Sequence, residues 1–343
     1  MTANIKTIDK QNMGVVLFGG TELLIEIALH LRNENIDVSV ITSPRQAEET
    51  VSHLGTLKSA LETQKLNHYV TKNLTDGILD QATQNFDSFL GISLGAAWLF
   101  DKATIYQYFN AKLYNIHPGG LPENRGAGGF SWQILMGERI GYFSCHRVNE
   151  TIDKGKVVFS SEFIYPQDCY KPIHYWQHYK EQVVKGLLKN LKNLLCDQFE
   201  DEAAQPEHLS TYWPRLNSKE QAWIDWNWSA KEISHFISAF DDPYDGAKSL
   251  WNAKTVHLKD ARLIESKYHF HPFQFGLIFR KHKDWIMVAA KSGSILIKSI
   301  IDGDGSSVSE RLTVGDRLYT THQQLDAKNY RPFYSSTGLQ VKT

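Results

Sequence analysis

Short apolar runs alternate with helical patterns along the amino-terminal part of the chain. Met13–Gly20 is an apolar run that ends in glycines, which is typical of a buried strand in a parallel sheet. Similar runs predict further strands at Ile36–Thr42, His68–Thr71, Phe86–Ser93 and Leu113–His117. The stretches between them carry apolar side chains at helical spacing, with Leu24, Ile27 and Leu31 on one predicted helix and Leu54, Leu57 and Leu61 on the next. Strands that alternate with helices predict an α/β fold with a Rossmann-like, doubly wound and mainly parallel sheet.

A hairpin and a long helix follow this alternating region. Tyr142–Val148 and Lys156–Phe163 read as two strands around a turn that contains Asp153-Lys154-Gly155. The next stretch, from about Pro172 to Cys196, is an amphipathic helix. Its apolar stripe consists of Trp176, Val183, Val184, Leu187, Leu188, Leu191, Leu194 and Leu195.

Periodicity is lost over residues 197–215, which are mostly polar and contain prolines. We therefore predict a first domain over 1–196, a linker over 197–215 and a second domain over 216–343. The second domain opens with a helix at Ala230–Phe240. Short alternating segments then predict a small β barrel or sandwich, at Thr255–Leu258, Gly276–Phe279, Trp285–Ala289, Ile295–Ile300 and Arg317–Thr320.

Composition narrows the class of protein. The 343 residues are 42% hydrophobic and 22% charged, which is ordinary for a globular chain of two domains. The formal net charge of -1 gives no support for nucleic-acid binding. The three cysteines include no CxxC pair, Met1–Gln11 lacks an apolar signal core, and no apolar stretch approaches the length of a membrane helix. We expect a cytoplasmic protein without a membrane partner.

Candidate chemistry gathers at the end of one predicted strand. Asn115 and His117 are two positions apart, so their side chains share one face of the strand Leu113–His117. In doubly wound sheets, ligands bind beyond the carboxyl ends of the strands, which is where these two residues fall. Asp153 follows His117 by 36 positions, in a turn that can fold back over the strand end.

An amide, an imidazole and a carboxylate together suit acyl transfer to an amine. His117 can take the proton of the attacking nitrogen or polarise the acyl oxygen, because imidazole titrates near neutrality. Asn115 can donate an amide hydrogen to the developing oxyanion, an interaction worth about 3 kcal/mol. Asp153 can fix the imidazole tautomer and stabilise its cation.

Each of these signals has a plain structural interpretation when it stands alone. A single His at a strand end is more often structural than catalytic, and Asp-x-Gly is by itself a turn signal. Gly19-Gly20 does not form GxGxxG, so no nicotinamide site is predicted. Cys145-His146 has no second ligand pair at metal spacing, so no metal site is predicted. Only the order and spacing of the signals favour catalysis.

Residues 13 to about 195 resemble the folate-dependent formyltransferases, a family that includes methionyl-tRNA formyltransferase and the nucleotide-sugar N-formyltransferases. The family pattern is a strand ending Asn-x-His, a loop ending Leu-Pro-x-x-(Arg/Lys)-Gly, and a later Asp-x-Gly. The chain reads NIH at 115–117, LPENRG at 121–126 and DKG at 153–155. The opening VLFGGTELLIEIALHL also resembles the family's first strand and helix.

The resemblance implies that Asn115, His117 and Asp153 are catalytic and that N10-formyltetrahydrofolate is the formyl donor and co-substrate. It also implies that the donor is held largely by backbone groups of two loops, with one further residue nearby. The residues that match are Trp98, Leu99 and Phe100 in one loop, Asn149, Glu150, Thr151 and Ile152 in the other, and Ala127.

The resemblance has one departure and one looser extension. Gly119-Gly120 stand where the family usually has Ser-Leu, so the backbone of this loop can approach the substrates more closely. Beyond the linker, Pro243-Tyr244-x-Gly246-Ala247 resembles the segment that joins the two domains in this family. The second domain then resembles the family's OB-like barrel up to about Thr320, and the tail to Thr343 is unassigned.

The leading hypothesis is an N-formyltransferase that acts on a nucleotide-linked amino sugar, in bacterial surface polysaccharide (lipopolysaccharide O-antigen) biosynthesis. The alternative is methionyl-tRNA formyltransferase, for which the chain lacks the expected basic excess. A non-catalytic folate- or nucleotide-binding module is a third reading. The expected partners are reduced folate and an amino sugar, with tRNA only under the alternative, and a homodimer stays open.

Overall fold

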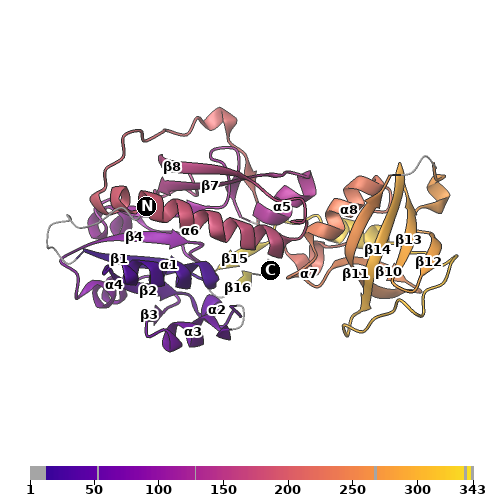
Figure 1. Cartoon of the computed structure of the whole chain (residues 1–343), viewed down its shortest axis with the longest axis horizontal. Helices are drawn as coiled ribbons and strands as arrows, with labels where there is room; N and C mark the ends of the chain where they lie inside the picture. The colour runs from indigo at the N-terminus through magenta and orange to yellow at the C-terminus, as the bar shows by residue number, and fades with distance from the viewer. Residues whose placement is uncertain (1–12, 52–53, 128, 266–268, 336–337, 341–343) are drawn as a thin grey trace.

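The computed structural model describes residues 13–51, 54–127, 129–265, 269–335 and 338–340. Met1–Gln11 and the outer ends of the predicted domains 1–196 and 216–343 lie outside the described residues. An α/β body and a β body lie end to end along the long axis of the molecule (Figure 1).

A seven-stranded sheet forms the α/β body, in the order β3-β2-β1-β4-β5-β7-β8. The strands β3, β2, β1, β4 and β5 pair in parallel, whereas β7 is antiparallel to β5 and β8 is antiparallel to β7. The bounds are β1 Met13–Gly19, β2 Asp37–Thr42, β3 Asn67–Val70, β4 Ser88–Leu94, β5 Leu113–His117, β7 Ile140–Arg147 and β8 Val157–Ile164. This arrangement confirms the predicted mainly parallel, doubly wound sheet.

Helices cover both faces of the sheet. Alternate residues of β1 point to opposite faces, so Val15 and Leu17 join one hydrophobic core while Val16 and Phe18 join another. The first core packs under α1 and α6, and the second under α4. The bounds are α1 Thr21–Asn33, α2 Pro44–Ala47, α3 Leu57–Thr63, α4 Asp76–Thr83, a π-helix at Ala103–Tyr108, α5 Gly129–Met136 and α6 Pro172–Cys196.

The predicted helix with Leu54, Leu57 and Leu61 is wrong at its start. Helix α3 begins at Leu57, because the side chain of Thr56 accepts a hydrogen bond from the backbone N–H of Ser59 and caps the helix there. Gly55, with a φ of +82°, turns the chain immediately before this cap. Leu54 therefore packs beside the core from outside the helix.

The β body is a five-stranded antiparallel sheet in the order β10-β11-β14-β13-β12, packed against α8. Leu250 pairs with Tyr319, and Leu277 pairs with Arg317, so one segment bonds to both edges and curls the sheet toward closure. The bounds are α7 Ser218–Gln221, α8 Ala230–Ala239, β10 Ala247–Trp251, β11 Lys254–Ile264, β12 Ile278–His282, β13 Trp285–Ala290 and β14 Gly293–Asp302.

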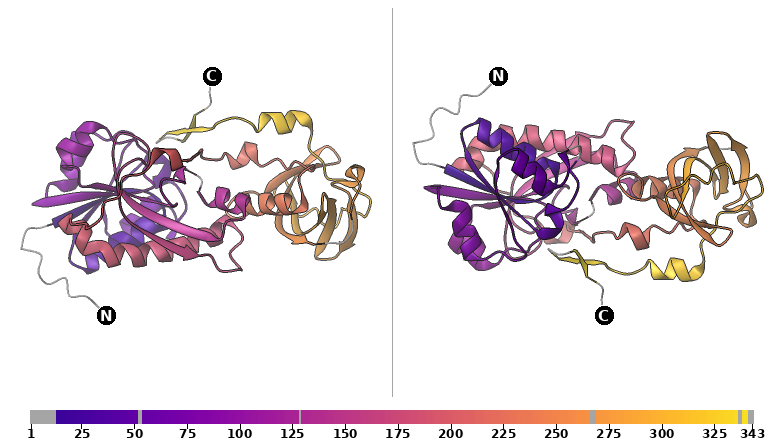
Figure 2. Two further views of the ribbon diagram at one scale, coloured as in Figure 1. Left: turned by 90° about the horizontal axis from the view of Figure 1, so that it is seen from above. Right: turned by 90° about the horizontal axis from the view of Figure 1, so that it is seen from below.

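Two connecting segments run back along the α/β body. Residues 197–215, predicted as a linker, contain β9 (Tyr212–Trp213), which pairs in parallel with β6 (Arg125–Gly126). After the β body, the chain forms α9 (His322–Ala327) and then returns to the α/β body as β15 (Phe333–Ser335) and β16 (Gly338–Gln340) (Figure 2). The described part of the carboxyl-terminal tail thus returns to the α/β body.

None of the helices in the described part of the chain combines the length and the apolar composition that a membrane crossing requires.

Candidate active site

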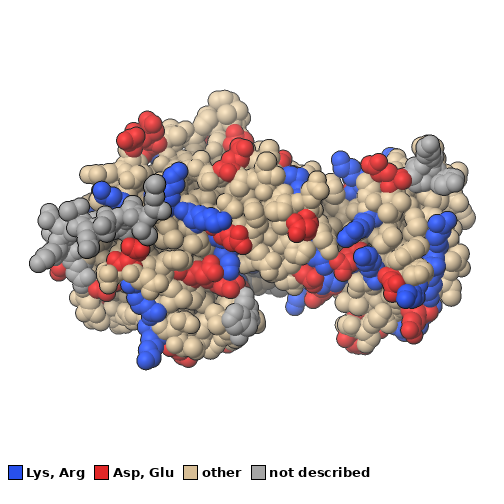
Figure 3. Space-filling model, viewed as in Figure 1, with Lys and Arg blue, Asp and Glu red and all other residues tan. Residues whose placement is uncertain are grey.

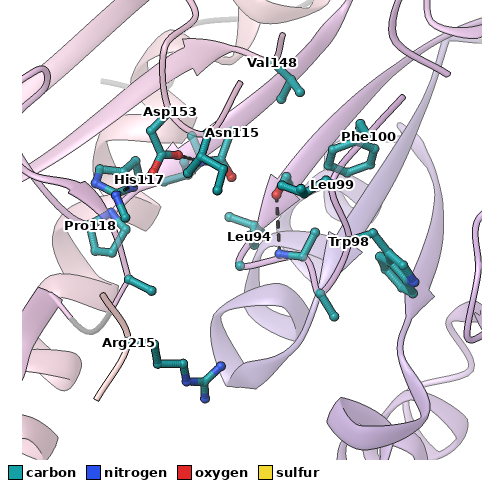
Figure 4. Close-up of a pocket in the computed structure, with 18 of the residues that line it drawn as sticks. Leu94, Trp98, Leu99, Phe100, Asn115, His117, Pro118, Val148, Asp153 and Arg215 are labelled. Carbon is teal, nitrogen blue, oxygen red and sulfur yellow. Dashed lines mark hydrogen bonds and ion pairs between the residues drawn. The ribbon is translucent and has the colours of Figure 1, made fainter. Parts of the chain in front are cut away.

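The three residues singled out in the sequence meet at the carboxyl end of β5 (Figure 4). His117 Nδ1 lies 3.6 Å from Asp153 Oδ2, and Asn115 Nδ2 lies 3.4 Å from Asp153 Oδ1. Asn115 and His117 project from one strand, while Asp153 reaches them from the β7–β8 turn. The carboxylate is therefore shared between the amide and the imidazole.

Close backbone packing fixes the turn that carries Asp153. A Cβ atom at Gly155 would lie 1.7 Å from the carbonyl oxygen of Arg147, so only glycine fits at this position. Asp153 itself adopts a left-handed φ of 54°, which is uncommon for a residue with a side chain. Gln205, from the segment after α6, donates to the carbonyl oxygens of Asp153 and Gly155 at 2.8 and 2.7 Å.

The end of the LPENRG motif also supports the carboxylate. The backbone N–H of Gly126 donates to Asp153 Oδ2 at 2.9 Å. Arg125 is buried and its Nε donates to the side chain of Gln205, which in turn holds the Asp153 turn. The motif therefore positions Asp153 directly, through the Gly126 N–H, and indirectly, through Arg125 and Gln205.

Asp153 is ionised throughout the physiological range. Burial raises the pKa of its carboxyl group, but the charge of His117, the nearby imidazole of His146 and the hydrogen bond from the Gly126 N–H outweigh burial and lower the pKa to about 2. The site therefore holds a fixed negative charge directly beside the imidazole of His117.

Hydrogen bonding determines which nitrogen of His117 carries a proton. Its Nε2 lies 2.5 Å from the carbonyl oxygen of Asn124, and a carbonyl can only accept, so Nε2 carries the hydrogen. Burial lowers the pKa of His117, although the charge of Asp153 acts in the opposite direction. Near neutral pH the ring is thus uncharged, with a free lone pair on Nδ1.

Gly119, one of the two glycines that depart from the family pattern, lies against this imidazole. A Cβ atom at Gly119 would lie 2.9 Å from the Cβ of Asn124 and 3.2 Å from His117 Nε2. The Gly119 carbonyl accepts a hydrogen bond from Ser144 Oγ at 2.8 Å, which fixes the loop. The absent side chain lets the loop bring the Asn124 carbonyl onto the ring.

His146 completes the site, and the sequence did not assign it a role. It lies opposite Asn115 in the antiparallel register of β5 and β7. Its Nδ1 donates to the Arg147 carbonyl at 2.8 Å, so its Nε2 accepts from Asn115 Nδ2 at 3.1 Å. The amide nitrogen of Asn115 is thereby directed to His146 and Asp153, and its oxygen faces the pocket (Figure 4).

A pocket of about 630 Å³ opens beside these side chains, within the range of small-molecule sites. Every residue predicted to contact the donor lines it, namely Trp98, Leu99, Phe100, Ala127, Asn149, Glu150, Thr151 and Ile152. The Trp98 indole N–H donates to the Lys72 carbonyl at 2.7 Å, so the only polar group of this side chain is already hydrogen-bonded within the protein. Leu99 is 73% exposed and offers an apolar side chain at the mouth.

Several lining residues were not singled out in the sequence. They come from four separate places in the chain and are Thr21, Arg45, Tyr212, Arg215 and the tail residues Arg331, Pro332 and Phe333. No spacing rule links the tail to β5, so the sequence carried no signal for their meeting. Within the described ranges, no group of three or more His, Cys, Asp or Glu side chains is arranged to hold a metal ion.

Two family models match the chain. Residues 12–183 match the model described as formyl transferase, and residues 217–312 match the formyl transferase C-terminal domain. A methionyl-tRNA formyltransferase from Nitrosococcus oceani is 26% identical over 240 residues, which cover 70% of this chain and 69% of that protein. A second one, from Clostridium tetani, is 28% identical over 54% of this chain and 58% of its own length.

Solved structures share the fold at lower identity. The sugar 3N-formyl transferase WlaRD, solved in the presence of dTDP and 5-N-formyl-THF, superposes with a TM-score of 0.63 at 15% identity and covers 84% of this chain and 97% of its own. The N-formyltransferase from Helicobacter canadensis, in complex with folinic acid and dTDP-3-aminofucose, gives 0.64 at 16% identity over 83% and 99%.

Proposed function

Since this chain belongs to the formyl transferase family, we propose that it moves a formyl group from N10-formyltetrahydrofolate to the primary amine of a nucleotide-linked amino sugar. The observation that carries the proposal is the convergence of Asn115, His117 and Asp153 on one pocket. The pocket can hold the reacting parts of a donor and an acceptor but does not enclose both molecules completely. The rest of the acceptor therefore extends toward its mouth.

The donor fits the loops that follow β4 and β7. Trp98 and Phe100 on one loop and Ile152 on the other offer flat or apolar surface for a pterin ring, and their loops offer backbone groups for its polar edge. Two structural neighbours were solved with reduced folates, which supports a folate at this site. The donor supplies a formyl group on N10, and the chain supplies orientation and proton transfer.

The tautomer of His117 gives a route for the proton. As the neutral amine attacks the formyl carbon, its nitrogen becomes cationic, and the free lone pair on His117 Nδ1 accepts the proton. Asp153, 3.6 Å away, stabilises the imidazolium. When the bond from the formyl carbon to N10 breaks, the same proton passes from Nδ1 to the leaving nitrogen, which restores neutral His117.

Asn115 orients the reactants in this scheme. Because its nitrogen is directed to His146 and Asp153, its oxygen is free to accept a hydrogen bond from the incoming amine. That bond turns the lone pair of the amine toward the formyl carbon. The role differs from the oxyanion donor suggested by the sequence, and it follows from the orientation of the amide.

Charge supports a small acceptor over tRNA. The net charge is -1, and on the face shown in Figure 3 lysines and arginines are interspersed with carboxylates instead of gathering into one basic patch. Of the structural neighbours named above, one is described as a sugar 3N-formyl transferase and the other was solved in complex with dTDP-3-aminofucose. The alternative is methionyl-tRNA formyltransferase, which is favoured by the names of the relatives found by sequence.

A substrate panel tests the proposal. We expect purified protein with N10-formyltetrahydrofolate to add one formyl mass to a 3- or 4-amino nucleotide sugar, and His117→Asn to abolish the gain while still binding folate. Transfer to methionyl-tRNA alone, at a rate that falls steeply with salt, would establish the alternative. Folate binding without transfer to any acceptor would indicate a non-catalytic binding module. We further propose that the formylated sugar is incorporated into a bacterial surface polysaccharide such as O-antigen. Analysis of the surface polysaccharide of a strain that lacks this protein, for loss of the formyl group, tests this step.

A further inference from the structure

The carboxyl-terminal tail is anchored along the segment that joins the two bodies. Gln221 Nε2 donates to the carbonyl oxygens of Lys328 and Tyr330 at 3.1 and 2.8 Å. Asn217, which is buried, donates to the Tyr330 hydroxyl at 2.6 Å. Lys328 donates to the Trp223 carbonyl at 3.0 Å. Residues 328–330 are therefore held at several points directly before the chain reaches the pocket.

Lys328 strengthens this anchor. Its ammonium group lies 4.3 Å from the centre of the Trp228 ring and 5.4 Å from that of Phe236, two side chains that pack on the core of the β body. A cation over aromatic faces is stabilised when it is partly removed from water. The tail is thus fixed to the second domain, while its next residues lie against the first.

Arg331 is held between two aromatic rings at the pocket. Its guanidinium lies 5.2 Å from the centre of the Tyr212 ring and 5.1 Å from that of Phe333. One of its nitrogens donates to the Tyr212 hydroxyl at 3.4 Å. Within the described residues, no carboxylate lies at ion-pair distance from Arg331, so its charge faces the pocket and solvent without a fixed counter-ion.

The pocket is lined by two carboxylates and by several arginines. Its two carboxylates are already engaged, Glu150 with Lys102 and Asp153 with His117 and His146. The lining arginines include Arg215 and Arg331, which flank the Tyr212 strand. A planar guanidinium that is held beside aromatic rings is preorganised for bidentate binding of a phosphate.

We infer that Arg331, Pro332 and Phe333 complete the pocket at the end where the acceptor binds, and that Arg331 binds the diphosphate of a nucleotide-linked acceptor. The inference rests on the proposed function and names the group through which the acceptor is recognised. Tyr212 and Phe333 hold the guanidinium in place, and their remaining exposed surface, 45% and 38%, is available to the nucleoside.

Position separates this acceptor end from the donor end. The donor loops contribute Trp98 and Phe100, whereas Arg215 lies across the pocket from them, on the side of Pro118 (Figure 4). Arg331 lines the same pocket and lies against Tyr212, three residues before Arg215 in the chain. An anionic acceptor that enters here would present its amine to His117 from the side opposite the donor loops.

Direct binding tests the inference independently of turnover. The measurement is a calorimetric titration of the full-length protein and of its Arg331→Ala variant with dTDP, with UDP and with 5-formyltetrahydrofolate. We expect Arg331→Ala to weaken nucleoside diphosphate binding by at least about tenfold and to leave folate binding unchanged. Arg331→Lys keeps the charge but loses the planar fork, so we expect an intermediate loss. Arg280→Ala removes an exposed arginine of β12, on the β body, and should match the unaltered protein.

Kinetics gives a second readout. With the amino sugar that the panel identifies, we expect Arg331→Ala to raise the KM for the nucleotide sugar about tenfold or more, with kcat and the KM for the donor little changed. Unchanged nucleoside diphosphate affinity in Arg331→Ala, no binding of either nucleotide by the unaltered protein, or a loss confined to folate would each overturn the inference. If the panel finds only tRNA as acceptor while nucleotide binding still depends on Arg331, the proposed function is wrong but the nucleoside diphosphate site at Arg331 is supported.

Discussion

The Nε2 atom of His117 lies 2.5 Å from the carbonyl oxygen of Asn124 and is thereby the protonated nitrogen of the ring. The basic atom is then Nδ1, beside Asp153. Burial lowers the pKa of His117 below its ordinary 6.5, so the neutral, active form predominates at pH 7.

We expect the acid limb of kcat/KM to lie below pH 6.5, with activity falling about tenfold per pH unit below the pKa of His117. The sign follows because protonation of Nδ1 removes the base. A pH profile of kcat/KM with the identified acceptor measures the acid limb. The ionisation of the acceptor amine is determined separately and corrected for. An acid limb centred above pH 6.5 would contradict the buried, neutral imidazole.

Asp153→Asn should lower kcat by about 10²- to 10⁴-fold, because the imidazolium loses the carboxylate that stabilises it. The charge of Asp153 raises the pKa of His117, so its removal should also shift the remaining acid limb to lower pH. Folate binding, measured by calorimetry, should persist. Asp304→Asn, which alters an exposed turn next to β14, is the matched control. A kcat unchanged in Asp153→Asn would exclude the proton route described above.

His146→Ala should reduce kcat by about tenfold or more while the KM values change little, because Asn115 loses the acceptor that directs its nitrogen away from the pocket. His146→Gln offers an amide oxygen in a similar place and should recover part of the rate. Steady-state kinetics of the two variants decides the matter. Equal losses in both would indicate that the imidazole acts for another reason than holding Asn115.

Gly155→Ala should impair both folding and turnover. The added methyl would lie 1.7 Å from the Arg147 carbonyl, so the β7–β8 turn must shift and carry Asp153 with it. Gly303→Ala meets no atom within 4 Å and is the control. Thermal melting and kcat of the two variants provide the comparison. A Gly155→Ala protein with unchanged stability and rate would show that the turn tolerates displacement.

The layout of the first domain was predictable because its signals are local. Apolar runs marked the strands, and one spacing pattern placed Asn115, His117 and Asp153 together. The start of α3 was missed because Thr56, a residue that caps the helix, outweighed the apolar spacing that included Leu54.

Contacts between distant segments were not predictable. The role of His146 depends on the register of β7 against β5, which a hydrophobic pattern does not specify. Arg331 reaches the pocket from a tail that is anchored to Asn217 and Gln221, and no local motif encodes these contacts. The direction of the Asn115 amide likewise follows from neighbours and not from its position in Asn-x-His.

The last prediction concerns the junction between the two bodies, where one lysine binds three carboxylates. Lys171 Nζ lies 3.2 Å from Asp241, 3.1 Å from Asp242 and 2.7 Å from Asp260. The side chains of Lys171 and Asp241 are only 8% and 1% exposed. Lys171 directly precedes α6 of the α/β body. Of its partners in the β body, Asp241 and Asp242 follow α8, and Asp260 lies on β11.

Lys171→Met should lower the free energy of unfolding by about 3 kcal/mol, because it leaves buried carboxylate charge without its cation. Urea denaturation measures the loss, with Lys298→Met on an exposed position of β14 as control. The double variant Lys171→Met with Asp241→Asn removes the buried negative charge as well and should recover part of the loss. If the double variant were less stable than Lys171→Met, the attractive hydrogen bonds of Asp241, and not its unbalanced charge, would dominate this junction. Recovery should be only partial, because Asp241 accepts the Asp242 N–H at Oδ1 (2.6 Å) and the Asp260 N–H at Oδ2 (2.7 Å), and the single oxygen of an asparagine can keep one of these two hydrogen bonds.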